Sequence, residues 1–183
     1  VVDINAFMVQ NIFEHHFGLP TDGTIALLNV GAAVSTLNIV SGGVSAFTRE
    51  INNAGNSVTE EIRKQCNVSY EQAEAYKRGG GPTQIMPQEV HEVIASSSST
   101  LAGEIQRSLD FYLATSGEAE ISKIYVCGGS AYLAPLASAI EKRARVPVEV
   151  FDPVGNMTVD TKYVNEADLR QRASQMVVAM GLS

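Results

Sequence analysis

The chain has 183 residues, of which 45% are hydrophobic and 18% charged, so it is expected to bury a core rather than stay disordered. Its length predicts one domain or two small subdomains. The net charge of -7 argues against nucleic acid as a partner, because phosphate binding needs clustered Lys and Arg. The same charge disfavours docking on anionic lipid, and since no apolar run is long enough to span a bilayer, direct membrane insertion is not expected.

The cysteines and histidines predict no metal site. Cys66 and Cys127 are far apart and have no Cys-x-x-Cys partner, which argues against a zinc site or disulfide scaffold and favours a reducing cytoplasm. His15 and His16 end a predicted helix, where the helix dipole favours a cation, and no further ligands have suitable spacing. No signal peptide precedes the first predicted strand, and a start without Met is expected of a fragment.

The first fifty residues predict one helix followed by a meander of three strands. Residues 1–4 have the pattern of a strand end, and residues 5–17 that of a helix with Asn5 as its cap. Three apolar or β-branched runs separated by Gly-containing turns then predict strands at residues 25–28, 35–40 and 44–51.

The middle of the chain predicts helices, at residues 57–65, 69–77, 87–94 and 101–115. Glu60 and Glu61 are expected in the first turn of their helix, where acids favour the helix dipole. Ser69 and Gln72 have the spacing of a capping box. The Ser-rich residues 96–100 leave open whether the last two patterns form one long helix, because Ser is only mildly unfavourable in helices.

The second half alternates between strand and helix patterns. A strand is expected at residues 121–127, a helix at 133–143, a strand at 147–151 and a final helix from Asn165. Helical connections between strands are typical of an α/β fold, and together with the meander they predict a mixed sheet flanked by helices.

Two Gly-rich turns follow predicted strands, around Gly31-Ala32-Ala33 and at Gly128-Gly129-Ser130. Such a turn lets backbone N–H groups approach a phosphate, and a helix start after it adds the positive end of a dipole. Neither turn is a Walker loop or a dinucleotide fingerprint. Taken alone, each is more simply explained as a tight turn, since Gly readily adopts positive φ.

The order of these features resembles the second half of the actin, sugar-kinase and heat-shock-chaperone superfamily. There, the first Gly turn is the second phosphate loop and the Gly-Gly-Ser turn is the adenosine loop. Eight short stretches are, more narrowly, similar to one family: Val2-Asp3-Ile4-Asn5-Ala6-Phe7, Asn29-Val30-Gly31-Ala32, Thr36-Leu37-Asn38, Phe47-Thr48-Arg49-Glu50-Ile51, Gly55-Asn56, Ala73-Glu74, Lys77-Arg78-Gly79 and Ala179-Met180-Gly181-Leu182. With these stretches, the chain resembles the PilM family of type IV pilus assembly proteins along essentially its whole length.

The resemblance implies a nucleotide site for ATP, with Mg expected in the complete protein. Its implied residues are Gly31, Ala32 and Ser35 at the phosphates, Glu74 and Lys77 at the ribose and adenine, and Gly128, Gly129 and Ser130 at the adenosine. Lys77 has a second explanation, because a lysine at a helix end can satisfy the terminal carbonyls. No catalytic residue is assigned.

One departure from the family pattern bears on catalysis. Asn29 stands where the pattern has Asp, which would organise Mg²⁺ or the attacking water. Asn is neutral and cannot act as a base, so binding is expected to survive while hydrolysis is in doubt. Any ATPase activity is expected to be weak and to need the complete protein, since half of the phosphate clamp is expected outside this chain.

The resemblance also implies domain organisation. The expected architecture is an actin-like, ribonuclease H-like lobe, with residues 1–52 and 100–183 forming subdomain 2A. Residues 53–99 are expected to form an inserted helical subdomain 2B, and the N-terminal lobe with the first phosphate loop is expected outside this chain.

The implied function is that of a cytoplasmic platform for the type IV pilus inner-membrane machinery, active in pilus biogenesis and twitching motility. It would be peripheral to the inner membrane, bind ATP and dock the cytoplasmic tail of PilN, with other inner-membrane and motor components as further partners. The groove for that tail draws on the lobe expected outside this chain. Two alternatives stay open: a sugar-kinase type of enzyme, for which no acid or sugar loop is clear, and a nucleotide-free actin-like scaffold lobe, which fits Asn29.

Overall fold

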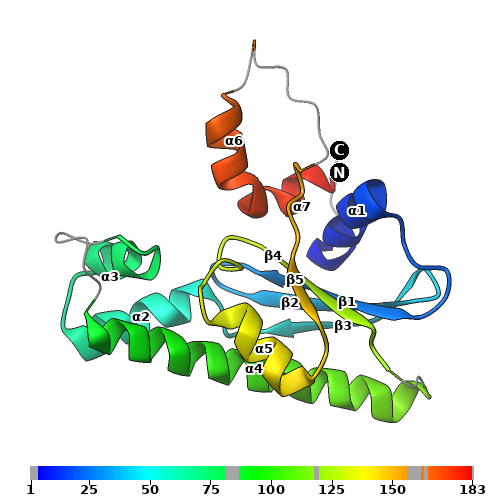
Figure 1. Ribbon diagram of the computed structural model, residues 1–183, viewed down its shortest axis with the longest axis horizontal. Helices are drawn as coiled ribbons and strands as arrows, with labels where there is room; N and C mark the ends of the chain where they lie inside the picture. The colour runs from blue at the N-terminus through cyan, green and yellow to red at the C-terminus, as the bar shows by residue number, and fades with distance from the viewer. Residues whose placement is uncertain (1–3, 81–86, 118–119, 156–161, 163–164, 183) are drawn as a thin grey trace.

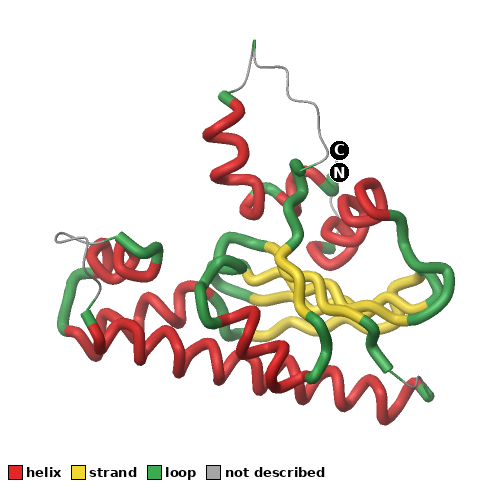
Figure 2. The backbone as a smooth tube through the Cα atoms, viewed as in Figure 1, coloured by secondary structure: helices red, strands yellow, loops and turns green. Residues whose placement is uncertain are grey.

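The computed structural model describes residues 4–80, 87–117, 120–155, 162 and 165–182. A five-stranded sheet lies between helices on both of its faces (Figures 1 and 2). The strands are β1 Thr24–Val30, β2 Ser35–Ser41, β3 Val44–Ile51, β4 Lys123–Cys127 and β5 Val148–Val150. The helices are α1 Asn5–Phe17, α2 Gly55–Cys66, α3 Tyr70–Lys77, α4 Gln88–Ser116, α5 Leu136–Ala144, α6 Glu166–Arg172, a 3₁₀ turn Ala173–Gln175 and α7 Val177–Met180.

The sheet has the order β3-β2-β1-β4-β5 and is mixed. β1, β2 and β3 form the predicted antiparallel meander, whereas β4 pairs parallel with both β1 and β5. The parallel pairs need helical crossovers, which α4 and α5 provide. The α/β expectation with a mixed sheet flanked by helices is therefore confirmed.

The central strand β1 is buried on both faces, because each face is covered by helices. Ala26 and Leu28 belong to the core shared with α4 and α5, while Ile25 and Leu27 pack with α1 and α7. Figure 1 shows these two helix layers on opposite sides of the sheet. Burial on both faces explains why the sequence of β1 is a nearly continuous apolar run and does not alternate between apolar and polar residues.

The expected Asn5 cap is wrong. Ile4 occupies the N-cap position of α1, and no side chain caps that helix. Residues 1–3, where a strand end was expected, lie outside the described residues.

The second helix begins earlier than expected, at Gly55. Its first N–H groups donate to the first Gly turn, Gly55 to Gly31 O at 3.0 Å and Asn56 to Ala32 O at 2.7 Å. This backbone contact with the sheet starts α2 in place of a capping side chain. Glu60 and Glu61 consequently lie beyond its first turn, a correction to the expected position, and pair with Arg63 and Lys64.

The third helix has the predicted capping box. Gln72 N–H donates to Ser69 Oγ at 3.2 Å, and Ser69 N–H donates to Gln72 Oε1 at 3.1 Å. Two polar backbone groups at the start of α3 are thereby satisfied without water.

The question left open by the Ser-rich segment is resolved by α4, a single helix of 29 residues. Its first half packs with α2 and α3 around Ile62, and its second half packs on the sheet around Ile105. The expected subdomain boundary at residues 99 and 100 lies inside this continuous helix, so α4 is shared by the two cores.

The expected final helix is divided into three short segments. Asn165 caps α6, accepting N–H groups of Ala167 and Asp168. A 3₁₀ turn follows and then α7, so that Ser174 and Val177 are buried against the rest of the fold while α6 projects away from the sheet (Figure 1).

Candidate functional site

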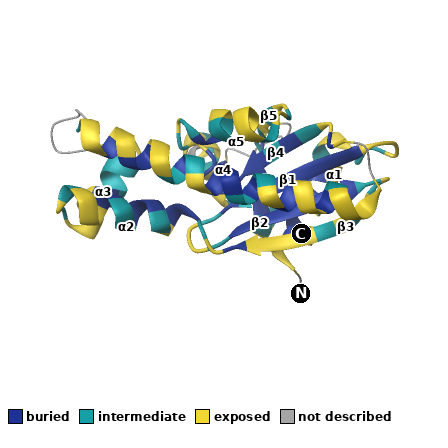
Figure 3. Cartoon of the chain, turned by 90° about the horizontal axis from the view of Figure 1, so that it is seen from below, coloured by how far each residue is buried: buried dark blue, intermediate teal, exposed yellow. Residues whose placement is uncertain are grey.

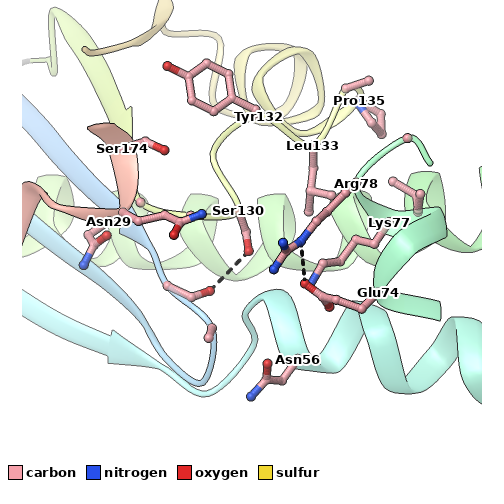
Figure 4. A pocket seen from close by; sticks show the side chains of 18 of the residues that line it. Asn29, Asn56, Glu74, Lys77, Arg78, Ser130, Tyr132, Leu133, Pro135 and Ser174 are labelled. Atoms are coloured by element: carbon pink, nitrogen blue, oxygen red, sulfur yellow. Dashed lines mark hydrogen bonds and ion pairs between the residues drawn. The ribbon is translucent and has the colours of Figure 1, made fainter. Parts of the chain in front are cut away.

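A cavity of about 1060 Å³ opens at the edge of the sheet where β1 and β4 end. Because these strands are parallel, their carboxyl ends bring the two Gly turns to the same edge. Seven of the eight residues predicted for the site line the cavity, namely Gly31, Ala32, Glu74, Lys77, Gly128, Gly129 and Ser130. Figure 4 shows Glu74, Lys77 and Arg78 together on one side, with Ser130 between them and Asn29.

The eighth predicted residue, Ser35, lies outside this lining. It is fully buried, and its hydroxyl donates to Asn53 O at 2.7 Å. The first residue of β2 therefore anchors the segment that leads into α2 and does not face the cavity.

The first Gly turn is closed by a hydrogen bond from Gly31 N–H to Val34 O at 3.2 Å. A strand follows it, so no helix dipole points into the cavity from this turn. The carbonyls of Gly31 and Ala32 are occupied by α2, while Ala32 and Ala33 are exposed at the tip. Hydrogen bonds from α2 to these two carbonyls thus hold the turn in place, and residues 32 and 33 at its tip stay exposed.

The second Gly turn requires a glycine at its first position. Gly128 has a φ of +98°, and a β-carbon there would meet Asn29 Oδ1 and lie 2.5 Å from Val30 O. No L side chain fits this conformation and this space together. Gly129 differs, because a β-carbon there would meet only the Gln175 side chain, at 3.3 Å.

Ser130 ties the two turns together. Its N–H donates to Val30 O at 3.0 Å, and its hydroxyl donates to Gly31 O at 3.4 Å. The helix expected from Leu133 begins only at Leu136, so its positive end is set back further from the Gly-Gly-Ser backbone. The turn therefore presents backbone, and not the start of a helix, at the edge of the sheet.

Lys77 is held by oxygen atoms of α2 and α3. Its ammonium group lies 2.7 Å from Glu74 Oε2, and it donates to Thr59 Oγ1 at 2.8 Å and to Gly55 O at 3.2 Å. Only 9% of its side chain is exposed. The carbonyl that it binds belongs to the start of α2, which differs from the expectation that it would satisfy the end of its own helix.

Glu74 is the centre of this polar group. It accepts from Thr59 Oγ1 at 2.7 Å and pairs with Lys77 and Arg78. Partial burial opposes ionisation, but hydrogen bonds from Lys77, Thr59 and Arg78, with the Lys77 charge, outweigh it and lower the pKa of Glu74. The carboxylate is therefore kept ionised beside the cavity.

Several lining residues were missed by sequence reasoning. Three come from helices or turns whose register decides which side chains face the cavity: Ile94 on α4, Leu133 after the second Gly turn and Ser174 before α7. No local pattern marks them. Tyr132 could have been found as an aromatic residue two positions after Ser130, and the structure shows it 63% exposed at the cavity.

The residues present fit a nucleotide better than they fit a metal ion. The cavity has the size of a small-molecule site, and both Gly turns line it. No group of three or more His, Cys, Asp or Glu converges within the part of the chain that the structure describes. Asn29, at the end of β1, offers an amide rather than a carboxylate, so these residues do not by themselves form a Mg²⁺ site.

None of the described helices combines the length and apolar character needed to cross a membrane.

Comparison with known proteins agrees with this architecture. The sequence matches the family described as type IV pilus assembly protein PilM over residues 1–183. A chain of a solved PilM-PilN type IV pilus biogenesis complex is similar at 25% identity and a TM-score of 0.84, over 100% of this chain and 51% of that chain. The chain thus spans about half the length of that structure.

More distant structures show the fold alone. MreB5 of Spiroplasma citri bound to ADP has 17% identity and a TM-score of 0.67, over 100% of this chain and 58% of that one. Ta0583, an archaeal actin homolog, has 10% identity and a TM-score of 0.63, over 99% and 53%. The expected actin-like fold is confirmed by these likenesses. With the sequence match along its whole length, the chain belongs to the PilM family of type IV pilus assembly proteins.

Proposed function

We propose that this chain forms one wall of an ATP-binding cleft in an actin-like component of the type IV pilus assembly platform. The observation that carries the proposal is the meeting of both Gly turns at one cavity, joined through Ser130. The ADP bound to the similar MreB5 structure supports a nucleotide rather than another ligand. The remaining wall would come from the lobe that the matched PilM-PilN chain has beyond the half that this chain spans.

Three groups of residues would hold the nucleotide. The exposed backbone at Ala32 would face the phosphates, and Gly128 and Gly129, which line the cavity without side chains, would face the adenosine. Glu74 and Lys77 would offer a carboxylate and an ammonium to the ribose and base, as a fixed pair. ATP would supply the phosphates whose charge the complete cleft must neutralise.

Hydrolysis by this chain is proposed to be weak. Asn29 lines the cavity at the end of β1, where an acid would be expected to orient Mg²⁺ or the attacking water, and its neutral amide cannot act as a base. Mg²⁺ bound with the nucleotide would need ligands from the phosphates, water and the other lobe.

Within the pilus machinery, we infer a cytoplasmic location at the inner membrane, reached through partners. PilN is the partner with support, since the similar solved structure is a PilM-PilN complex. We further propose docking of the cytoplasmic tail of PilN and contacts with other inner-membrane and motor components, with membership of the PilM family as their support. A tail peptide added to the complete protein should bind, and failure to bind in a buffer that preserves the fold would overturn this partner.

The nucleotide site is tested by calorimetric titration of MgATP into the complete protein that contains this chain. Gly128→Ala should abolish the binding heat, whereas Gly129→Ala should retain it, because only Gly128 combines positive φ with backbone contacts. Absence of heat from the unaltered protein at millimolar nucleotide would refute ATP binding.

A nucleotide-free scaffold lobe is the second candidate, and the Lys77 geometry favours it. Lys77 and Glu74 already satisfy each other and Thr59, so they need no ligand for their stability. If this chain is a nucleotide-free scaffold lobe, titration with MgATP gives no binding heat while the PilN tail peptide still binds. These two results together distinguish the scaffold from the ATP-binding protein.

A further inference from the structure

Two arginines converge on one glycine at the surface between α4 and α5. A β-carbon added to Gly103 would lie 3.3 Å from Arg143 Nη1 and 3.7 Å from Arg107 Nη1. Both guanidinium groups thus stand within 4 Å of a single point, although each belongs to an exposed residue of a different helix. Arg143 also donates to Ser99 Oγ at 3.1 Å, which holds it across α4.

No carboxylate neutralises this pair among the described residues. The ion pairs found there involve six other cations, Arg63, Lys64, Lys77, Arg78, Lys123 and Arg170. Lys142 and Arg145 extend the basic end of α5, again without an ion pair in the described part of the chain. In a chain with 20 acidic and 13 basic residues, such a cluster of unpaired cations is a local exception.

Acidic residues of α4 and α5 do not form ion pairs with these two arginines among the described residues. Glu104, three residues before Arg107 on α4, accepts a hydrogen bond from Asn53 at 3.2 Å and forms no ion pair with the described residues. Asp110 and Glu141 are exposed on the same helices, and neither forms an ion pair with the described residues. The guanidinium groups at Gly103 therefore remain available to an external carboxylate.

An exposed aromatic residue continues this surface. Gly103, Arg107 and Phe111 are four residues apart, so they lie along one face of α4 over about 12 Å. Phe111 is 57% exposed and its ring centroid lies 6.0 Å from that of Phe47 on β3, which limits its movement. Seen from below, α4 runs along the outside of this face with α5 beside it (Figure 3).

We propose that Arg143, Arg107 and Phe111 form a docking stripe for an acidic segment of a partner protein. Its carboxylates would pair with the two guanidinium groups, whose planar donors suit carboxylate oxygens, and an apolar side chain would cover Phe111. Charge complementarity selects this occupant. Nucleic acid or an anionic bilayer would extend beyond this small patch and meet the repulsion of a chain with a net charge of -7, whereas a short acidic segment can stay within the patch.

Fluorescence anisotropy with labelled peptides on the complete protein tests the stripe. A 12-residue peptide of alternating Glu and Leu should bind, and its affinity should fall roughly tenfold or more for Arg107→Glu/Arg143→Glu and as salt rises. Matched peptides with Lys for Glu, or Ser for Leu, should bind more weakly. Phe111→Ser should remove the preference for Leu over Ser and leave the salt dependence unchanged.

The control is Arg172→Glu on α6, which also reverses an exposed arginine without an ion pair among the described residues. It should leave peptide affinity unchanged, and all variants should retain the circular dichroism spectrum and the nucleotide affinity of the parent. The proposal is overturned if the acidic peptide fails to bind. It is also overturned if Arg172→Glu weakens peptide binding as much as the Arg107→Glu/Arg143→Glu variant does. Binding of phosphatidylserine vesicles in preference to the peptide would likewise refute it.

Discussion

The hydroxyl of Ser130 lies so close to Gly55 that a β-carbon on Gly55 would overlap Ser130 Oγ. The same hydroxyl donates to Gly31 O, which also accepts the N–H of Gly55. One carbonyl thus joins the end of β1, the start of α2 and the second Gly turn. The shape of the cavity depends on this contact between segments that are far apart in the chain.

Gly55→Ala should destabilise the protein, against its helix propensity. In a helix this change normally stabilises by up to about 1 kcal/mol, but overlap with Ser130 should instead cost about 1–3 kcal/mol. On a Ser130→Ala background, which removes the overlapping atom, the same change should be much less costly. Guanidinium denaturation of the four proteins measures the coupling, and additivity within about 0.5 kcal/mol would contradict the contact.

Gly128→Ala should lower stability far more than Gly129→Ala. At Gly128 an alanine must adopt the left-handed conformation that the glycine already has, and its β-carbon overlaps Asn29 Oδ1 and Val30 O. At Gly129 an alanine displaces only the Gln175 side chain. Thermal unfolding should show a loss of about 2 kcal/mol or more for Gly128→Ala and under about 1 kcal/mol for Gly129→Ala. Gly117→Ala, which has φ +78° and open space, isolates the cost of the conformation alone.

Glu74 should make stability depend on acid pH. Its pKa is lowered in the folded state, because hydrogen bonds from Lys77, Thr59 and Arg78 outweigh the burial that opposes ionisation. Its contribution is therefore fully present above the ordinary value of 4.5 and is lost as pH falls through the lowered pKa.

The matched variant is Glu74→Gln, which cannot ionise. It should be less stable than the parent at neutral pH, and the difference should shrink as pH falls below 4.5. Urea denaturation across this range checks the sign. A difference that stays constant with pH would show that the charge of Glu74 is not what stabilises the cluster.

Asn29→Asp should raise ATP hydrolysis by the complete protein, because it places a carboxylate at the end of β1 where the amide now lies. Steady-state phosphate release should increase about tenfold or more and become more dependent on Mg²⁺. Asn56→Asp, at another amide that lines the cavity, is the control and should leave the rate unchanged. An equal rate for Asn29→Asp and the parent would show that Asn29 does not limit the reaction.

Local patterns predicted the elements well where one short segment determines its own structure. The Ser69–Gln72 capping box and the three-stranded meander are of this kind, because caps and hairpin turns act within a few residues. The start of α2 was missed for the opposite reason. Its first N–H groups are satisfied by Gly31 and Ala32, which lie more than twenty residues earlier in the chain.

The candidate site divides in the same way. The positions of the two Gly turns and the family were predictable from the sequence, since both depend on short motifs with a set spacing. The inward position of Ser35 at Asn53, and the meeting of Arg143 and Arg107 at Gly103, became evident from the packed structure. Such contacts depend on the register of packed strands and helices, which long-range packing sets and no local pattern encodes.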